Sequence, residues 1–288
     1  PYRSAVGKAY RGSLAKHRPD NLCADVIQGV LQKAGAFPHE HIEDVIVGCA
    51  MPEGEQGMNV ARFALLLAGL PVVVPGVTVN RFCSSGVQTI AMAAHQIQAG
   101  DAECLLAGGV ESMSMIPMGG NKLVASRRVM DNNPDYNLGM GLTAENVASE
   151  YKISREAQDK FAVESHNKAI SAIEKGLFKN EILPLNIEKR TPGEAGAVNV
   201  KKFTFDQDEG PRLGTNEQAL GKLRPVFKTK GSVTAGNTSQ MSDGAAMCLV
   251  CSEEFVKKHN LKPMARFVSY SVKGVPPRIM GITCRSYS

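Results

Sequence analysis

The sequence contains no tryptophan, and only 6% of its 288 residues are aromatic. Its lysines and arginines outnumber its acidic residues by 33 to 28, but they are scattered and no base-stacking aromatic residues lie between them. Because nucleic-acid-binding surfaces combine clustered positive charge with such aromatic residues, we expect no nucleic acid among the partners. No apolar run approaches the roughly 20 residues of a membrane-spanning helix, so we expect no membrane span either.

Several other sequence signals are also missing. Neither G-x-G-x-x-G nor a Walker loop is present, which excludes the common dinucleotide and phosphate motifs. The seven cysteines are an odd number without the spacing of a disulfide framework, which indicates a reducing compartment. Cys248 and Cys251 form a Cys-x-x-Cys pattern, but no second pair completes a zinc site, so we expect no metal. We interpret both as core cysteines on opposite faces of a strand.

The most informative stretch lies between residues 72 and 109. It opens with a β-branched apolar run at 72–79, which predicts the approach to a buried strand. Apolar residues then recur every three or four positions over 87–97, which predicts one face of a helix ending at Gly100. Residues 104–107 predict the next buried strand, closed by two glycines. A strand, tight turn, helix and strand in this order build a parallel sheet.

Cys83 lies in the tight turn, one or two residues before the predicted helix. The unpaired N–H groups and the dipole at a helix amino end favour negative charge, and the thiolate is the reactive form of cysteine. Ser84, Ser85 and Gly86 are small enough for a substrate to reach the sulfur, as at a nucleophile elbow. The alternative is a buried structural cysteine, which is the usual fate of a lone cysteine. The position favours a nucleophile.

The rest of the chain alternates predicted helices and strands. We predict helices over 20–33 and 60–67, a helix opened near Met140 with Thr143 as its N-cap, a helix from Ser154 to Gly176, and strands over 42–47, 182–187 and 265–272. The apolar residues of 60–67 exceed what one core face needs, so this helix is either an ordinary core helix or part of an interface. Residues 3–14 predict a loop of the kind that leaves a strand. Because only two residues precede this loop, we expect that strand to be absent from the chain.

Two motifs resemble the thiolases, closest to the degradative 3-ketoacyl-CoA thiolases. The first is residues 80–88 together with 108–115, and the second is residues 234–246. In that family the cysteine at the position of Cys83 accepts the acyl group. The resemblance implies an α/β, thiolase-like fold of layered α-β-α units with mostly parallel mixed sheets, whose second copy is incomplete in this chain.

The resemblance also implies a domain organisation. Residues 1–115, continued by 236–257, correspond to the N-terminal α/β half. Residues 116–235 correspond to a loop domain that covers the coenzyme A site, and 258–288 to the beginning of the C-terminal half.

The ligand-binding residues are implied by the same resemblance. The methionine at the position of Met140 lies over the reactive cysteine, and the residue before it, Gly139, is often histidine in short-chain enzymes, which favours a longer or broader acyl range here. The family places an arginine beside the adenine nucleotide, a leucine against the ligand, and an alanine and a serine against pantetheine, at the positions of Arg212, Leu223, Ala235 and Ser239. A solvated loop arginine and a leucine of a local core are the alternatives for the first two.

The function implied is thiolytic cleavage of a 3-ketoacyl-CoA by coenzyme A in β-oxidation, without a permanently bound cofactor. The implied partners are acyl-CoA, coenzyme A and a second copy in a homodimer or a dimer of dimers, in the cytoplasm of a bacterium or in a peroxisome or mitochondrion. The family's Gly-His-Pro, Cys-x-Gly and Asn-Glu-Ala-Phe motifs do not occur. We therefore expect that the chain as written is not competent alone. The alternatives are a biosynthetic acetoacetyl-CoA thiolase and a non-catalytic acyl-CoA-binding remnant.

Overall fold

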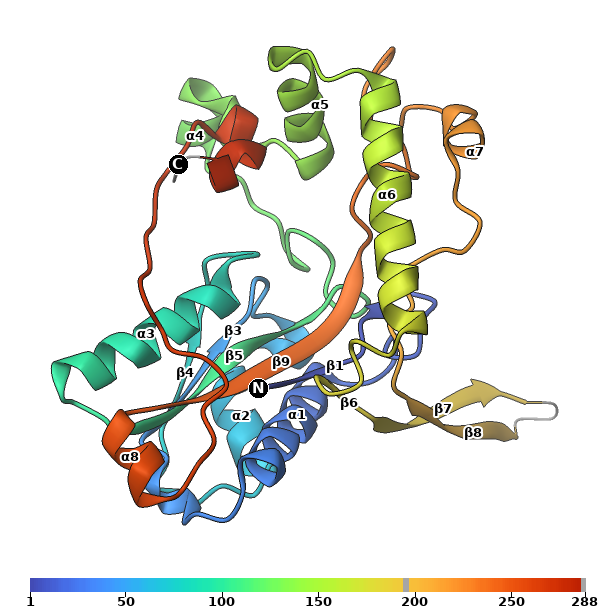
Figure 1. Ribbon diagram of the computed structural model, residues 1–288. Helices are drawn as coiled ribbons and strands as arrows, with labels where there is room; N and C mark the ends of the chain where they lie inside the picture. Colours follow the sequence, from blue (N-terminus) through green and yellow to red (C-terminus); the bar gives the residue numbers. More distant parts are fainter. Residues whose placement is uncertain (194–196, 286–288) are drawn as a thin grey trace. The chain divides into compact units, whose positions relative to one another are not determined.

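The computed structural model describes residues 1–193 and 197–285 (Figure 1). The chain forms two compact units. Unit 1 contains Pro1–Lys122, Phe178–Gly210 and Met241–Val268, and unit 2 contains Leu123–Leu177, Pro211–Gln240 and Ser269–Ser288. The two units are described separately below.

A mixed sheet forms the centre of unit 1. Within the described residues its seven strands lie in the order β4 (Gly76–Val79), β3 (Asp44–Gly48), β5 (Cys104–Ser112), β9 (Ser242–Cys251), β1 (Tyr2–Ser4) and β6 (Ile182–Leu183), with β2 (Gly7–Lys8) paired to β9. Strand β3 is parallel to both β4 and β5, whereas β9 is antiparallel to β5 and β1. The α/β fold class predicted from the sequence is confirmed.

Helices cover both faces of this sheet. Successive side chains of β3 point to opposite faces and are apolar, so both faces need a covering layer. Val45 and Val47 pack in the larger core, under α1 (Pro19–Ala34) and α2 (Val60–Leu67). Ile46 packs in a smaller core under α3 (Ser85–Ala99). Figure 1 shows α3 on one side of the sheet and α1 and α2 on the other. All three helices were predicted to within two residues of their observed ends.

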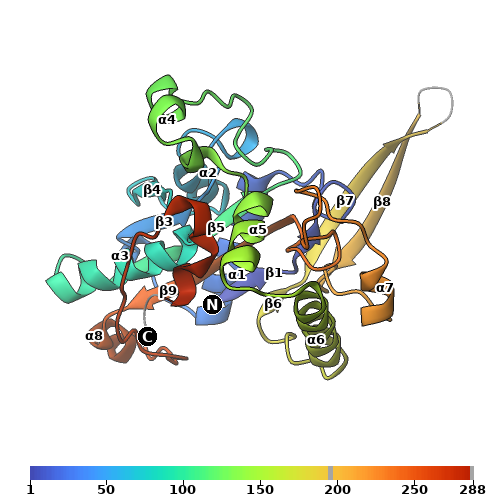
Figure 2. The ribbon, with the colours of Figure 1, turned by 90° about the horizontal axis from the view of Figure 1, so that it is seen from above.

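The strand predicted over 182–187 is two strands separated by Pro184. Proline has no N–H to donate to a ladder, so the pairing changes partner at this residue. Strand β6 pairs with β1, whereas β7 (Leu185–Pro192) pairs with β8 (Val198–Phe205) in a separate two-stranded sheet. Figures 1 and 2 both show this hairpin extending away from the central sheet.

Short helices complete unit 1. They are the 3-10 turns η1 (His39–His41) and η2 (Gly54–Gln56), and α8 (Glu253–Lys258) after β9. Phe255 of α8 is buried in the larger core and meets Phe37 edge to face, with ring centroids 5.7 Å apart. This contact fixes α8 beside the end of α1.

Unit 2 is helical. It contains α4 (Arg127–Asn132), η3 (Pro134–Asn137), α5 (Met140–Glu150), α6 (Arg155–Glu174), α7 (Glu217–Gly221) and η5 (Pro277–Arg285). Helix α6 begins after Ser154, whose side chain accepts a hydrogen bond from the N–H of Ala157 at 3.2 Å, as the predicted cap requires. Gly176 follows with a φ of 65°, so the predicted end is confirmed as well.

Two predicted strand assignments are wrong. Residues 265–272 are irregular, and Val268 is 78% exposed. A strand needs a neighbour for its N–H and C=O groups, and no described strand pairs with this segment. The first strand, expected to be absent, is present as β1 between β9 and β6. Its three residues are too few to show an alternating pattern.

The predictions around α3 also need correction. Only Gly76–Val79 of the run at 72–79 forms a strand, and Val72 and Val73 are 75% and 74% exposed. In α3, Val87 is 58% exposed whereas Thr89 is fully buried. Thr89 is buried because its Oγ1 donates to the carbonyl oxygen of Gly108 at 2.9 Å. The helix therefore faces the sheet with Thr89, whereas the apolar periodicity predicted that Val87 would face it.

Two element boundaries were misplaced. Thr143 is not an N-cap, because α5 begins three residues earlier and the Thr143 hydroxyl donates to the Met140 carbonyl oxygen at 2.8 Å. Strand β5 does not stop at its glycines but continues to Ser112. At Gly108 a Cβ would overlap the carbonyl oxygen of Ala246 on β9. The glycine therefore permits close approach of two strands and does not end one.

This close approach leads to a stability prediction. We expect Gly108→Ala to lower the free energy of unfolding by about 1–3 kcal/mol, because the new methyl group must push β9 away. Gly86→Ala is the matched control, since a Cβ there meets no atom within 4 Å. The measurement is the urea midpoint of each variant. Equal midpoints would show that the β5–β9 contact is not as tight as described.

Candidate active site

Cys83 lies between the carboxyl end of β4 and the start of α3, and its side chain is exposed. In open α/β sheets ligands bind outside the carboxyl ends of parallel strands, which is where this turn is placed. Helix α3 begins at Ser85 with Ser84 as its N-cap, so Cys83 directly precedes the cap as the sequence predicted. The N–H groups of Gly86 and Val87 have no hydrogen-bond acceptor among the residues that the structure describes. They are donors available to an anion.

The turn that carries Cys83 is held in a strained conformation. Phe82 has a φ of 47°, in the left-handed region that residues with a Cβ rarely adopt. Its N–H donates to Asn80 Oδ1 at 2.8 Å, and Asn80 Nδ2 donates to the carbonyl oxygen of Ala50 at 2.9 Å. The Arg81 N–H donates to Ser85 Oγ at 2.8 Å, and that hydroxyl donates to the Phe82 carbonyl oxygen at 2.6 Å. Strained conformations persist where several contacts impose them together.

Small residues let the first turn of α3 lie directly on the sheet. A Cβ at Gly48 on β3 would come within 2.6 Å of the Ser85 side chain, and one at Gly109 on β5 within 3.0 Å of the Gly48 carbonyl oxygen. The helix terminus is thereby fixed against two strand backbones. The sulfur of Cys83 is presented on this rigid base.

A second polar network supports the same region and was missed from the sequence. Glu111, near the end of β5, accepts hydrogen bonds from the Ala50 N–H at 2.6 Å and from Gln56 Nε2 at 2.5 Å. Gln56 is fully buried, and its Oε1 accepts from the Ser112 N–H at 2.9 Å. One feature of the sequence could have indicated this network: Glu111 follows closely after Gly108 and Gly109, where the strand was predicted to stop. Through Ala50 this network reaches the Asn80 side chain.

Among the six cysteines whose side chains the structure describes, Cys83 differs from the other five by its exposure. Cys23, Cys49 and Cys104 are buried, and Cys248 and Cys251 are half-buried. Burial raises the pKa of the thiols of Cys23 and Cys49 to about 12, and that of Cys248 to about 11. These three groups are therefore protonated at neutral pH, and Cys83 is the cysteine that a large reagent can reach.

In unit 2, a loop is tied to α5 by a buried carboxylate. Glu145, 4% exposed, accepts hydrogen bonds from the N–H groups of Ser232 at 3.0 Å and Val233 at 2.9 Å. Phe227 of the same loop packs against Gly141, where any Cβ would collide with its ring. Met140, the first residue of α5, is 42% exposed beside this contact. The role of Glu145 could not be predicted from the sequence, because its partners lie 87 and 88 residues away.

The same loop carries three of the predicted ligand-binding residues. Leu223 is 37% exposed and lies against Gly236, where a Cβ would come within 2.6 Å of the leucine. Ala235 and Ser239 flank that glycine and are exposed. The Asn237 side chain accepts from the Thr234 N–H at 2.7 Å and donates to Asp159 Oδ1 at 2.9 Å, which fixes the loop to α6.

Arg212, the remaining predicted residue, lies in an exposed segment before α7. Its N–H donates to His166 Nδ1 at 3.1 Å. In the described part of the chain its guanidinium has no carboxylate within ion-pair distance, so it is available to an anionic ligand. Cys83 belongs to unit 1 and the other five predicted residues to unit 2. The expectation that Met140 lies over Cys83 stays a prediction.

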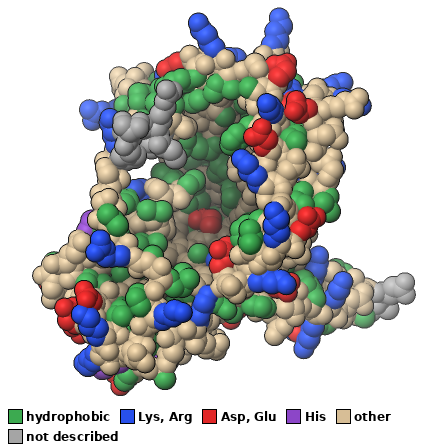
Figure 3. All heavy atoms as spheres, in the orientation of Figure 1, with side chains coloured by type: hydrophobic (Ala, Val, Ile, Leu, Met, Phe, Trp, Pro, Cys, Tyr) green, Lys and Arg blue, Asp and Glu red, His purple; other side chains and the backbone are tan. Residues whose placement is uncertain are grey.

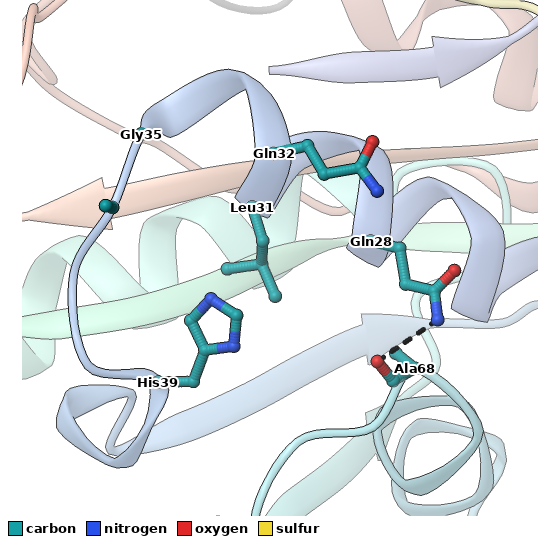
Figure 4. A pocket seen from close by; sticks show the side chains of 7 residues that line it. Gln28, Leu31, Gln32, Gly35, His39 and Ala68 are labelled. Atoms are coloured by element: carbon teal, nitrogen blue, oxygen red, sulfur yellow. Dashed lines mark hydrogen bonds between the residues drawn. The ribbon is translucent and has the colours of Figure 1, made fainter.

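One hollow of unit 1 lies away from Cys83. It measures about 550 Å³ and is bordered by the end of α1, the start of η1 and the residue after α2 (Figure 4). Gln28 Nε2 donates across it to the Ala68 carbonyl oxygen at 3.2 Å. These segments border the amino ends of the parallel strands, the edge opposite Cys83, so the hollow is not part of the candidate site.

The structure shows neither a concentrated charged patch on the visible face nor a metal-binding group among the described residues. Figure 3 shows lysines and arginines dispersed over the visible face and mixed with acidic residues. Among the described residues, no group of three or more histidine, cysteine or acidic side chains could hold a metal ion. No helix in that part of the chain is long and apolar enough to cross a membrane.

Comparison with known proteins identifies the family. The profile of "Thiolase, N-terminal domain" matches residues 1–254. The chain is 48% identical over 280 residues to a protein of Bacillus subtilis (strain 168) named "3-ketoacyl-CoA thiolase", a match that covers 97% of this chain and 71% of that protein. It is 43% identical over 294 residues to an "Acetyl-CoA acetyltransferase" of Pseudomonas aeruginosa, covering 97% and 72%.

A solved structure agrees with these relatives. The chain is similar to the crystal structure of the Bacillus anthracis acetyl-CoA acetyltransferase, with a TM-score of 0.84, 39% identity, and coverage of 99% of this chain and 73% of that one. The chain belongs to the thiolase family, as its motifs predicted. It is therefore an acyltransferase of a family that uses coenzyme A as a substrate and needs no permanently bound cofactor.

A labelling experiment tests the position of Cys83. In a brief iodoacetamide pulse at neutral pH, we expect Cys83 to react at least about tenfold faster than Cys23 and Cys49, because they are buried and protonated. Peptide mapping by mass spectrometry gives the rate for each cysteine. The Cys83→Ser variant is the control and should lose the fast phase. Preferential labelling of Cys248, a half-buried thiol whose pKa is raised, would argue against Cys83 as the nucleophile.

Proposed function

We propose that Cys83 is the acyl-accepting nucleophile of thiolysis. Its sulfur attacks the 3-keto carbon of a 3-ketoacyl-CoA, the bond between carbons 2 and 3 breaks, and acetyl-CoA leaves after its carbanion gains a proton. The thiol of coenzyme A then attacks the thioester on Cys83 and releases a shortened acyl-CoA. The observation that carries this proposal is the exposed cysteine beside the free N–H groups at the amino end of α3.

Coenzyme A recognition is proposed for unit 2. Small exposed residues such as Ala235 and Ser239 allow a thin pantetheine arm to lie along the loop, and hydroxyls orient its amides. Leu223 and Met140 offer half-exposed apolar surface, and the unpaired guanidinium of Arg212 suits the anionic nucleotide end. Glu145 positions this loop by its hydrogen bonds to two backbone N–H groups.

A degradative role in β-oxidation is the more specific proposal. It is supported by the relative named 3-ketoacyl-CoA thiolase at 48% identity. Gly139 supports it as well, since a Cβ there meets no atom within 4 Å and the position is open in this chain. The relatives named acetyl-CoA acetyltransferase, at 43% and 40% identity, support the biosynthetic alternative. All of these relatives are bacterial, which favours the cytoplasm among the compartments considered.

Substrate length separates the two roles. For the protein purified from its own source, we expect kcat/KM for 3-ketodecanoyl-CoA to exceed that for acetoacetyl-CoA. Gly139→His should reduce this ratio by about tenfold or more, since the imidazole occupies the space that a longer acyl chain would use. Gly139→Ala is the matched control, with a change of less than about threefold.

The outcomes of this assay are distinct. A wild-type preference for acetoacetyl-CoA would favour the biosynthetic role, and turnover by Cys83→Ser would exclude the proposed nucleophile. The polypeptide of residues 1–288 should be assayed beside the protein from its own source. The expectation that this polypeptide alone does not catalyse thiolysis stays a prediction. Intact mass after incubation with acyl-CoA shows whether it still forms the acyl-enzyme, which the non-catalytic alternative does not do.

We further propose that the protein is a homodimer. Helix α2 buries Val60 and Leu65 but exposes Phe63, Leu66 and Leu67 by 47%, 41% and 52%. The helix therefore has a core face, as an ordinary core helix does. It also has an exposed apolar face, which is suited to an interface. The edge strand β4 lies next to it in the fold, preceded by exposed valines. An exposed apolar face beside an unpaired strand edge is suited to a second copy across a two-fold axis.

Sedimentation at micromolar concentration tests the dimer. We expect Phe63→Glu to convert the dimer to a monomer, because a buried unpaired charge at the interface costs several kcal/mol, of order ~3. Phe161→Glu is the matched control, since Phe161 is 74% exposed on α6 of unit 2. A folded wild type that sediments only as a monomer would refute the proposal.

A further inference from the structure

Cys104 and Cys251 face each other across β5 and β9. They are direct partners in the antiparallel register, and their sulfur atoms are 3.7 Å apart. Figure 1 shows the two strands side by side along their length. Both residues belong to unit 1, so their separation does not depend on how the two units are placed.

The backbone at this pair is suited to a disulfide. The Ser252 N–H donates to the Glu103 carbonyl oxygen at 2.8 Å, and this bond flanks the cysteine pair on one side. In an antiparallel ladder that pattern makes Cys104 and Cys251 a non-hydrogen-bonded pair, whose Cα atoms are about 4.5 Å apart. Disulfides span Cα separations of about 4.4–6.8 Å. Side-chain rotation alone can therefore close the gap between the sulfur atoms.

The two thiols have different environments. Cys104 is buried, whereas Cys251 is half-buried at the end of β9. The contact between the two sulfur atoms holds the pKa of Cys251 below its usual value, and the same contact, together with burial, raises the pKa of Cys104. The carboxylates of Glu43 and Glu103 act in the same direction on Cys104. Cys251 is thus both the more acidic and the more exposed thiol of the pair.

We propose that Cys104 and Cys251 form a redox-active thiol pair that a hydroperoxide converts to an intrachain disulfide. The Cys251 thiolate attacks one oxygen of hydrogen peroxide, the O–O bond breaks, and Cys251 becomes a sulfenic acid while hydroxide leaves. The sulfur of Cys104 then attacks the Cys251 sulfur, the S–S bond forms, and the departing hydroxide takes the Cys104 proton as water. Two electrons pass from the two sulfurs to the peroxide.

This pair is separate from the candidate active site. Cys104 is the first residue of β5, at the amino end of a strand parallel to β3, whereas Cys83 follows the carboxyl end of β4. Cys248, three residues before Cys251, points to the opposite core and donates to the Ala107 carbonyl oxygen at 3.3 Å. Oxidation of the pair is therefore distinguishable from modification of Cys83 by peptide mapping.

The test uses the wild-type protein and hydrogen peroxide. After a short treatment and blocking of free thiols, a non-reducing digest should contain the peptides of Cys104 and Cys251 joined, and dithiothreitol should separate them. We expect this linkage to form at least about tenfold faster than Cys23 or Cys49 is oxidised, since those thiols are buried and protonated. The Cys83→Ser variant should form it equally well.

Two variants sharpen the result. Cys104→Ser removes the resolving thiol, so Cys251 should stop at a sulfenic acid that dimedone traps. Cys248→Ser is the matched control on the same strand and should leave the yield of linked peptide unchanged. The proposal is overturned if Cys104 and Cys251 remain free thiols in the wild type while other cysteines oxidise, or if Cys251 pairs with Cys248 instead.

Discussion

The position of Cys83 depends on direct contact between a helix terminus and strand backbone. Gly48 and Gly109 leave no side chain between the first turn of α3 and the sheet, and a Cβ at Gly48 would come within 2.6 Å of Ser85. Thr89 completes the contact by donating to the Gly108 carbonyl oxygen. Any larger residue at these positions would lift the helix and move its free N–H groups away from the cysteine. The nucleophile role proposed for Cys83 would lose rate steeply with such displacement.

The turn itself adds a second constraint. The left-handed backbone at Phe82 costs about 1–3 kcal/mol of free energy, and the hydrogen bonds of Asn80 and Ser85 on both sides of it offset this cost. Because Asn80 also holds the Ala50 carbonyl oxygen, and Ala50 donates to Glu111, the turn is linked to β5 as well as to β4. The exposed sulfur therefore belongs to a rigid segment whose geometry does not have to be assembled when a ligand arrives.

Sequence patterns predicted the helices that are determined by residues close together in the chain. Helices α1, α2 and α3 follow from apolar periodicity and from glycines that permit a positive φ, such as Gly100 at 81°. The failures depend on tertiary partners. Residues 265–272 have strand-like composition but no described ladder to join, and Thr89 replaces Val87 at the sheet because of one carbonyl oxygen. The place of Cys83 just before a helix was predictable from its motif, whereas Glu145 acts through backbone N–H groups far along the chain.

The cysteines show how one sheet produces different thiol chemistries from the same side chain. Cys248 and Cys251 are three residues apart on β9, so the strand sends one to the core under α3 and the other to the core under α1. Cys248 meets a carbonyl oxygen and stays protonated, whereas Cys251 meets the sulfur of Cys104, and this contact lowers its pKa. Cys83, outside both cores, is the exposed one among the six cysteines whose side chains the structure describes. The reactivity of each β9 thiol depends on the sheet face to which its side chain points and on its partner on β5. The Cys-x-x-Cys spacing reveals neither.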